Sequence, residues 1–210
     1  MIMYDKIQYI SQGNSITEQL NNIQQVLDAG CTWLQLRYKK GTEAEMRKLA
    51  IATKKLIENY NCTFIINDYP ELVEATGADG VHLGLTDTPI EQARKIVGRD
   101  KIIGGTANTL EDVLQRHREQ CNYVGLGPFR FTQTKEKLSP VLGLSGYSTI
   151  MTQLQEMEIN IPVFAIGGIQ QEDIQPILNT GIYGVALSGY ITQHENKKQL
   201  LNQLYTLCSH

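Results

Sequence analysis

Basic and amide side chains alternate along one short segment, Gln35-Leu36-Arg37-Tyr38-Lys39. Residues two apart share a face of an extended strand, so Gln35, Arg37 and Lys39 would point the same way. Two cations on one face favour binding of a phosphate or another anion, because both form charge-assisted hydrogen bonds with anionic oxygens. A solvated strand end with an incidental ion pair is the alternative interpretation.

Two aspartates have a spacing that suits a divalent cation. The apolar run before Asn67 ends in Asp68, and Asp87 follows the next apolar run, which ends at Gly84, by three residues. Oxygen ligands of this kind, completed by phosphate and water, suit Mg2+. Asp87 could instead cap a helix that begins near Pro89. A metal site is therefore favoured only if a polyphosphate binds beside the two carboxylates.

Further polar residues end other apolar runs. His82 lies between Val81 and Leu83, which favours a buried, hydrogen-bonded histidine over a catalytic base. Thr106 follows Gly104-Gly105, where the backbone could approach a ligand closely, although a helix-capping role explains a threonine there equally well.

The last two apolar runs end in Gly167-Gly168 and in Leu187-Ser188-Gly189. Glycine-containing loops after the last strands of a barrel often present backbone N–H groups to a phosphate. Glycine also fits a tight turn, but its presence in both loops favours a phosphate site.

Eight short apolar runs alternate with amphipathic segments such as Ser15–Ala29, Glu43–Tyr60 and Leu110–Glu119, which have hydroxyl caps at Ser15, Thr42 and Thr109. This repetition predicts a (β/α)8 TIM barrel that forms a single domain over residues 1–210. An open doubly wound sheet is less favoured, because no G-x-G-x-x-G follows the first strand. The predicted strands are Lys6–Ser11, Trp33–Tyr38, Thr63–Asp68, Gly80–Gly84, Lys101–Thr106, Tyr123–Pro128, Pro162–Gly168 and Gly184–Gly189.

Composition narrows the class of partner. A formal net charge of −3 gives no reason to expect nucleic acid or an anionic membrane as a partner. The four cysteines show no zinc-binding spacing, and the amino terminus has no signal-peptide pattern, so we expect a cytoplasmic protein with reduced thiols. The sequence leaves the number of subunits open between a monomer and a homodimer.

One long irregular segment, from Pro128 to Gly143, follows the sixth predicted strand. Long loops in compact domains usually bind ligands or cover sites, which favours a functional loop over a surface insertion. This loop contains Thr132, Gln133, Thr134 and Lys135.

Taken together, these positions resemble the thiamine-phosphate synthase family, which couples a pyrimidine pyrophosphate to a thiazole phosphate in vitamin B1 biosynthesis. The resemblance extends over nearly the whole chain, and the order and spacing of its segments are specific. The matching segments are Gln35–Lys39, Ile66–Asp68, Ala78–Gly84 with Asp87, Gly125–Pro128, Thr132–Lys135 and Ala165–Ile169.

The resemblance implies a (β/α)8-barrel transferase that acts on small phosphorylated substrates, with Mg2+ held by Asp68 and Asp87. It implies catalytic roles for Arg37, Lys39 and Lys135, which would neutralise the departing pyrophosphate. The implied pyrimidine-pyrophosphate site comprises Gln35, Leu36, Arg37, Tyr38, Lys39, Asn67, Thr106 and Lys135. The implied thiazole-phosphate site comprises Thr132, Gln133, Thr134, Gly168, Leu187 and Ser188.

The family mechanism is dissociative: a pyrimidine methylene cation forms, and the thiazole nitrogen attacks it without a side-chain nucleophile. The sequence departs from the family pattern at Thr106, where serine is usual, and at Leu85, where glutamine is usual. A thiazole tautomerase and a non-catalytic barrel that binds thiamine precursors are the rival hypotheses. The set of cations and carboxylates favours the synthase, because an aromatising tautomerase does not need it.

Overall fold

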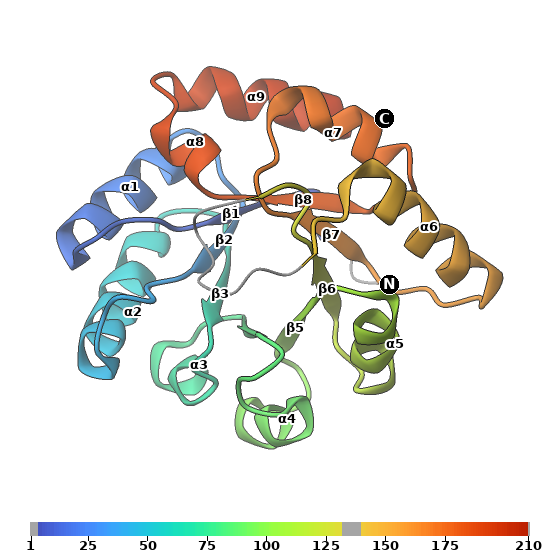
Figure 1. Ribbon diagram of the computed structural model, residues 1–210. Helices are drawn as coiled ribbons and strands as arrows, with labels where there is room; N and C mark the ends of the chain where they lie inside the picture. The colour runs from blue at the N-terminus through green and yellow to red at the C-terminus, as the bar shows by residue number, and fades with distance from the viewer. Residues whose placement is uncertain (1–3, 132–139, 210) are drawn as a thin grey trace.

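Eight parallel strands form a closed barrel in chain order, and the helices surround it (Figure 1). The computed structural model describes residues 4–131 and 140–209. Closure is complete because β1 pairs with β8, with Ile7 opposite Val185. The predicted TIM barrel is therefore confirmed. The strands are β1 (Ile7–Ile10), β2 (Trp33–Leu36), β3 (Thr63–Asn67), β4 (Gly80–Leu83), β5 (Ile102–Ala107), β6 (Tyr123–Leu126), β7 (Val163–Ile166) and β8 (Gly184–Leu187).

Helices α1, α2 and α5 begin at capping residues that the sequence predicts. The Ser15 side chain accepts a hydrogen bond from the Glu18 N–H, and Thr42 and Thr109 form capping boxes. Within the described residues, no helix combines the length and apolar character needed to cross a membrane. The helices are α1 (Ile16–Asp28), α2 (Glu43–Ile57), α3 (Glu71–Thr76), α4 (Ile90–Val97), α5 (Leu110–Arg118), α6 (Gly143–Glu156), α7 (Gln171–Leu178), α8 (Gly189–Gln193) and α9 (Lys197–Cys208).

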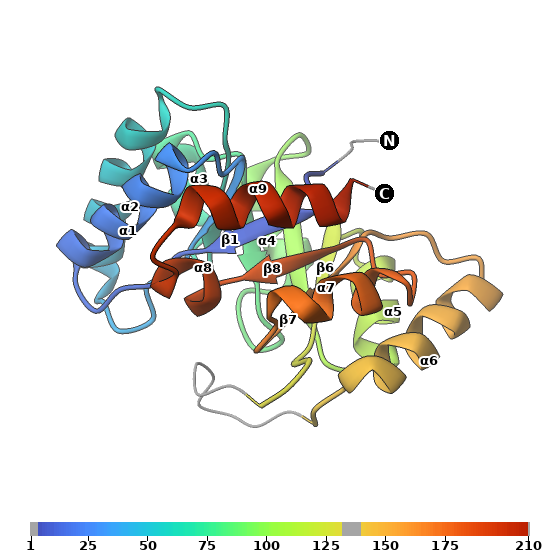
Figure 2. The same ribbon diagram turned by 90° about the horizontal axis from the view of Figure 1, so that it is seen from above.

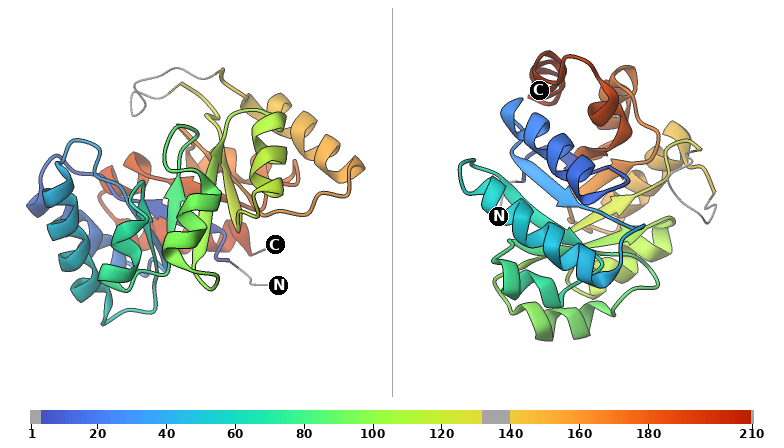
Figure 3. Two further views of the ribbon diagram at one scale, coloured as in Figure 1. Left: turned by 90° about the horizontal axis from the view of Figure 1, so that it is seen from below. Right: turned by 90° about the vertical axis from the view of Figure 1, so that its left-hand side faces the viewer.

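Helices on the outside of the barrel cover the side chains that point out of the strands. Leu34, Leu36 and Val81 belong to this outer core, which packs against the helices. In Figure 3 the green helices α4 and α5 lie outside the green strands of the barrel. In Figure 2 the short helix α8 follows β8 at the end where that strand leaves the sheet, and α9 lies beside β1.

Aromatic side chains fill the amino-terminal half of the barrel interior. The Trp33 ring meets the Tyr123 and Phe164 rings edge to face, with centroids 5.1 and 4.9 Å away. Small residues on neighbouring strands make room for these rings, since a Cβ on Gly184 would lie 2.7 Å from Phe164 Cε1. We call Trp33, Tyr123 and Phe164 the aromatic layer. The barrel is therefore packed at this end rather than open, and space for a ligand remains only at the carboxyl ends of the strands.

Candidate active site

A cavity of about 340 Å3 lies at the carboxyl ends of the strands. Its walls are the inward-pointing residues at the strand ends together with the loops that follow β7 and β8. The period-2 alternation of a strand explains which side chains enter it: Gln35 and Arg37 do, whereas their neighbours do not. Seven residues of the predicted sites line this cavity: Gln35, Arg37, Asn67, Thr106, Gly168, Leu187 and Ser188.

The other predicted residues lie outside the cavity lining. Leu36 and Tyr38 are buried in the outer core, because alternation turns them toward the helices, so their side chains do not face the cavity. Lys39 forms an ion pair with Asp68 instead of lining the cavity. The predicted loop residues Thr132, Gln133, Thr134 and Lys135 lie outside the described residues.

Asp68 and Asp87 meet after β3 and β4. Asp68 has a left-handed backbone with φ of 70°, and its N–H donates to the His82 carbonyl over 2.9 Å. Burial, together with the hydrogen bond to Asp87, raises the pKa of Asp68 to about 6, although Lys39 acts to lower it. The pKa of Asp87 is lowered: burial acts to raise it, but the hydrogen bonds from Asp68 and Gly84 outweigh burial. The two carboxyl groups therefore lie in contact, with the positive charge of Lys39 beside them.

The pair of carboxyl groups fits Mg2+. A divalent cation would relieve the repulsion between the two neighbouring carboxylates. Among residues 4–131 and 140–209, no group of three or more histidine, cysteine, aspartate or glutamate side chains could hold a metal ion. Mg2+ differs from metals that need such a group, because it usually takes one or two carboxylates together with water and substrate phosphates.

The structure excludes the capping interpretation of Asp87. Helix α4 starts after Pro89 without a side-chain cap, whereas Asp87 Oδ2 accepts a hydrogen bond from the Gly84 N–H over 2.7 Å. Asp87 is thus fastened to the end of β4, with its carboxylate next to Asp68. The helix-capping interpretation of Thr106 is wrong as well, because Thr109 caps α5.

Polar side chains form a continuous network between the aromatic layer and the cavity. Gln35 Nε2 donates to Gln8 Oε1 over 3.0 Å, and Gln8 Nε2 donates to the Tyr123 hydroxyl over 3.2 Å. The two ring nitrogens of His82 lie 3.0 Å from the Tyr123 hydroxyl and 3.1 Å from Thr106 Oγ1. His82 is therefore buried and hydrogen bonded, as the sequence predicts.

The network joins the aromatic layer to the cavity. Burial raises the pKa of Tyr123, so its hydroxyl stays protonated while it accepts from Gln8 and contacts His82 Nδ1. His82 Nε2 in turn contacts the Thr106 hydroxyl, which lines the cavity. The sequence patterns did not predict Gln8 or Tyr123 as part of the site. Gln8 could have been noticed, because it is a polar residue within the otherwise apolar and aromatic strand Ile7–Ile10.

Two glycines shape the loop after β7. Gly167 and Gly168 have φ of 101° and 69°, a region that other residues rarely adopt. A Cβ on Gly168 would also lie 2.6 Å from Arg130 Cγ, in the segment that follows β6. Hydrogen bonds from the Phe129 and Arg130 N–H groups to Ile166 and Gly167 carbonyls, at 2.9 and 3.1 Å, hold the two segments together.

Helix α8 begins directly after Ser188, and Ser188 lines the cavity together with the Gly167–Gly168 loop. The first N–H groups of a helix have no partner within it and suit a phosphate, as do the glycine-rich turns beside them. Gly189 of the predicted phosphate loop also lines the cavity, as do Tyr190 and Gln193, which the sequence patterns did not predict as site residues.

Comparison with known proteins agrees with this geometry. The family model described as thiamine monophosphate synthase matches residues 7–191. A thiamine-phosphate synthase of Flavobacterium johnsoniae is 55% identical over 202 residues, which cover 96% of this chain and 95% of that protein. The thiamine-phosphate synthase of Flavobacterium psychrophilum is 57% identical over 202 residues, covering 96% of this chain and 98% of the relative.

A solved structure agrees as well. The thiamine phosphate pyrophosphorylase of Pyrococcus furiosus superimposes with a TM-score of 0.83 at 28% sequence identity, covering 97% of this chain and 95% of that one. The family model spans most of the chain, and the curated relatives match it along nearly their whole length. This chain therefore belongs to the thiamine monophosphate synthase family.

Proposed function

We propose that this protein is a thiamine-phosphate synthase, which joins hydroxymethylpyrimidine pyrophosphate to a thiazole phosphate and releases pyrophosphate. One observation carries the proposal: a single cavity is lined by Arg37 and Asn67 at one side and by the glycine loop Gly167–Gly168 at the other. The Asp68–Asp87 pair follows Asn67 directly, just outside the residues that line the cavity. Such a cavity suits two phosphorylated substrates. The names of the Flavobacterium relatives support the same reaction.

The proposed chemistry begins with the departure of pyrophosphate from the pyrimidine methylene carbon. This bond breaks readily only if the negative charge that develops on the leaving group is neutralised. Arg37 lines the cavity and Lys39 stands beside Asp68, so both cations can face the pyrophosphate, and we assign Lys135 the same role. Asp68 and Asp87 would hold Mg2+, which, when bound, supplies further positive charge at the pyrophosphate.

The polar network below the cavity would orient the pyrimidine. Gln35, Asn67 and Thr106 present amide and hydroxyl groups to the cavity, and hydrogen bonds behind Gln35 and Thr106 hold these two in place. The aromatic layer beneath them keeps bulk water away from the methylene cation, which is reactive toward water. The thiazole phosphate would bind at Gly168, Leu187 and Ser188, joined by Thr132, Gln133 and Thr134 of the loop after β6.

The proposal covers one catalytic domain over residues 1–210 in the cytoplasm, acting on small phosphorylated molecules and not on nucleic acid or membranes. The free state of Cys31, Cys62, Cys121 and Cys208 supports a reducing compartment. A homodimer is compatible with it, and light scattering would measure the number of subunits.

The test is incubation of the purified protein with the pyrimidine pyrophosphate, a thiazole phosphate and Mg2+. We expect release of pyrophosphate together with thiamine phosphate, with either the aromatic or the carboxylated thiazole phosphate as the partner. Absence of pyrophosphate with both forms would reject the synthase. Conversion of a thiazole phosphate tautomer without the pyrimidine substrate would instead favour a tautomerase, and tight binding without conversion would favour a non-catalytic barrel.

A further inference from the structure

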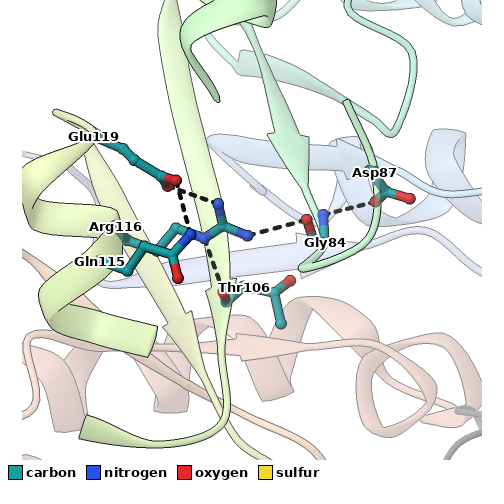
Figure 4. Close-up of polar contacts among 6 residues, drawn as sticks. All are labelled: Gly84, Asp87, Thr106, Gln115, Arg116 and Glu119. Carbon is teal, nitrogen blue, oxygen red and sulfur yellow. Dashed lines mark hydrogen bonds and ion pairs between the residues drawn. The ribbon is translucent and has the colours of Figure 1, made fainter. Parts of the chain in front are cut away.

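A buried arginine approaches the active site from behind the barrel wall. Arg116 lies on the buried face of α5, and only 4% of its surface is exposed. Figure 4 shows its guanidinium group reaching the ends of two adjacent strands. Nε donates to the Thr106 carbonyl over 3.1 Å, and Nη2 donates to the Gly84 carbonyl over 3.0 Å.

The remaining contacts of Arg116 fix the orientation of the guanidinium group. Nη1 forms an ion pair with Glu119 at 2.8 Å, and Gln115 Nε2 holds the other oxygen of that carboxylate over 2.9 Å. Gly105 provides the space, since a Cβ there would lie 2.6 Å from Arg116 Cδ. The planar guanidinium group therefore has a partner at each nitrogen: Glu119 at the end of α5, Gly84 at the end of β4 and Thr106 in β5.

Both carbonyls that Arg116 contacts belong to residues with a second polar group in the active site. The Gly84 N–H donates to Asp87 Oδ2 over 2.7 Å, as Figure 4 shows. The Thr106 hydroxyl lines the cavity and contacts His82. A movement of either carbonyl would therefore displace a proposed Mg2+ ligand or a proposed pyrimidine-binding hydroxyl.

We propose that Arg116 is a positioning residue for Mg2+ and pyrophosphate, acting through Gly84 and Thr106 without touching either ligand. Without its donors, two partly buried carbonyls would each lose a hydrogen bond, and the Gly84–Asp87 turn would shift toward water. We expect the effect at the pyrophosphate side of the cavity. Within the described residues, the hydrogen bonds and the ion pair of Arg116 reach Thr106, Gly84 and Glu119, and not the loops after β7 and β8. This inference rests on the proposed function.

The test compares Arg116→Met with Arg118→Met, a matched control on the exposed side of the same helix, where Arg118 forms an ion pair with Glu111 at 3.4 Å. Electron paramagnetic resonance would measure Mn2+ binding with inorganic pyrophosphate present. For Arg116→Met we expect the Kd for Mn2+ to rise at least about fivefold and the KM for the pyrimidine substrate at least about tenfold. The KM for the thiazole phosphate should stay within about twofold, Arg116→Lys should fall between the two, and Arg118→Met should match the unaltered protein.

A second variant reaches the same contacts by another route. Gly105→Ala leaves every charge in place but forces the Arg116 side chain to move, so it should reproduce the pattern of Arg116→Met even if that variant folds poorly. Unchanged Mn2+ binding in either folded variant, or an equal rise of both KM values, would overturn the proposal, as would an unaltered protein that binds no Mn2+. Normal Mn2+ binding without formation of thiamine phosphate would count against the proposed function alone.

Discussion

Thr106 is held from both faces of β5. Its hydroxyl meets His82 on the inner face, and its carbonyl accepts from Arg116 on the outer face. The glycines before it serve these two contacts: Gly104 makes room for the Tyr123 side chain and Gly105 for Arg116. The sequence suggested instead that these glycines let the backbone approach a ligand. A donor fixed in this way is already oriented before the substrate binds.

Tyr123→Phe tests the network behind Thr106. The variant removes one hydroxyl that serves both Gln8 and His82. Two buried groups lose a partner, so the free energy of unfolding should fall by about 1–3 kcal/mol. The kcat/KM for the pyrimidine substrate should fall about tenfold, equivalent to about 1.4 kcal/mol. Urea denaturation and steady-state kinetics measure the two quantities.

Tyr183→Phe is the control for this variant, since the Tyr183 hydroxyl donates to the Tyr4 carbonyl over 2.8 Å, far from the cavity. It should lose stability but retain kcat/KM. Equal kinetics in the two variants would show that the network only stabilises the fold.

Asp87→Asn tests the proposed metal site with little change of shape. The amide oxygen can still accept from the Gly84 N–H, but the negative charge is lost. The Mg2+ concentration for half-maximal activity should rise at least about tenfold. Asp79→Asn is the matched control, because Asp79 accepts from the Phe64 N–H over 2.7 Å at the opposite end of the barrel. An identical Mg2+ dependence in both variants would remove Asp87 from the metal site.

Alternation along the second strand allowed the sequence to predict that Gln35, Arg37 and Lys39 share a face. Gln35 and Arg37 do line the cavity, whereas Lys39 pairs with Asp68 beside it. The same pattern could not predict Arg116, because a helical arginine ordinarily points to solvent. Its only signal is the spacing of three from Val113, which puts both on the buried face of α5. Contacts such as this depend on how a helix packs on the sheet, which no local pattern specifies.

The loops after β6 and β7 form one unit joined through α7. Both Nη atoms of Arg130 contact the Asp173 carboxylate, at 2.6 and 2.8 Å, and Nη1 also donates to the Gly168 carbonyl over 2.9 Å. Asp173 in turn accepts from the Gln170 N–H at the start of α7. A single carboxylate therefore links the helix start to the glycine loop of the proposed thiazole-phosphate site.

Asp173→Ala should disturb that loop. We expect the free energy of unfolding to fall by about 1–2 kcal/mol, chiefly from the lost cap, because Arg130 is half-exposed and its ion pair is screened by solvent. The KM for the thiazole phosphate should rise several-fold while the KM for the pyrimidine substrate stays constant. Glu172→Ala, at the exposed neighbouring position, should change neither. A rise of both KM values would mean that the link acts on the whole site.

Predicted strands and observed strands differ mainly at their carboxyl ends. The seventh strand was expected to run through Gly168 but ends at Ile166, and the sixth ends at Leu126 rather than Pro128. The apolar pattern of the sequence identifies the part of a strand that packs in the core. The residue at which the chain leaves the sheet depends instead on backbone dihedral angles. The positive φ of Gly167 and Gly168 turns the chain out of the sheet at that point.

The barrel interior consists of three levels: the aromatic layer, the polar network above it and the cavity at the top. Tyr123 belongs to two of them, since its ring packs on Trp33 while its hydroxyl joins the network. This order explains how two glutamines, Gln8 and Gln35, and His82 lie inside a barrel at little cost, because each finds hydrogen-bond partners above the aromatic layer.

Burial of weak acids predicts how the whole molecule responds to alkaline pH. Burial raises the pKa of Cys208 to about 11 and those of Cys121 and Tyr9 to about 12. Their unfolded-state pKa values are lower, about 8.5 for cysteine and about 10 for tyrosine. Above about pH 8.5 the unfolded chain loses these protons first, so the folded state binds more protons and its stability falls as pH rises.

The urea midpoint should therefore decrease between pH 8 and pH 10.5. Each buried thiol that stays protonated lowers the free energy of unfolding by up to about 1.4 kcal/mol per pH unit above its unfolded pKa. Cys208→Ala should make the decrease smaller. A midpoint that does not change over this range would contradict the assigned burial of these groups.

The space that a side chain at position 105 would need, between β5 and α5, is filled by Arg116. This restricts which residues homologues can carry at the two positions. A larger residue at 105 displaces the arginine, and a shorter residue at 116 leaves a void that only a side chain at 105 can fill. Exchange of one position is thus harmful unless the other changes with it. Homologues with a bulkier residue at 105 should carry a short one at 116, and they need some other donor for the two carbonyls that the arginine serves here.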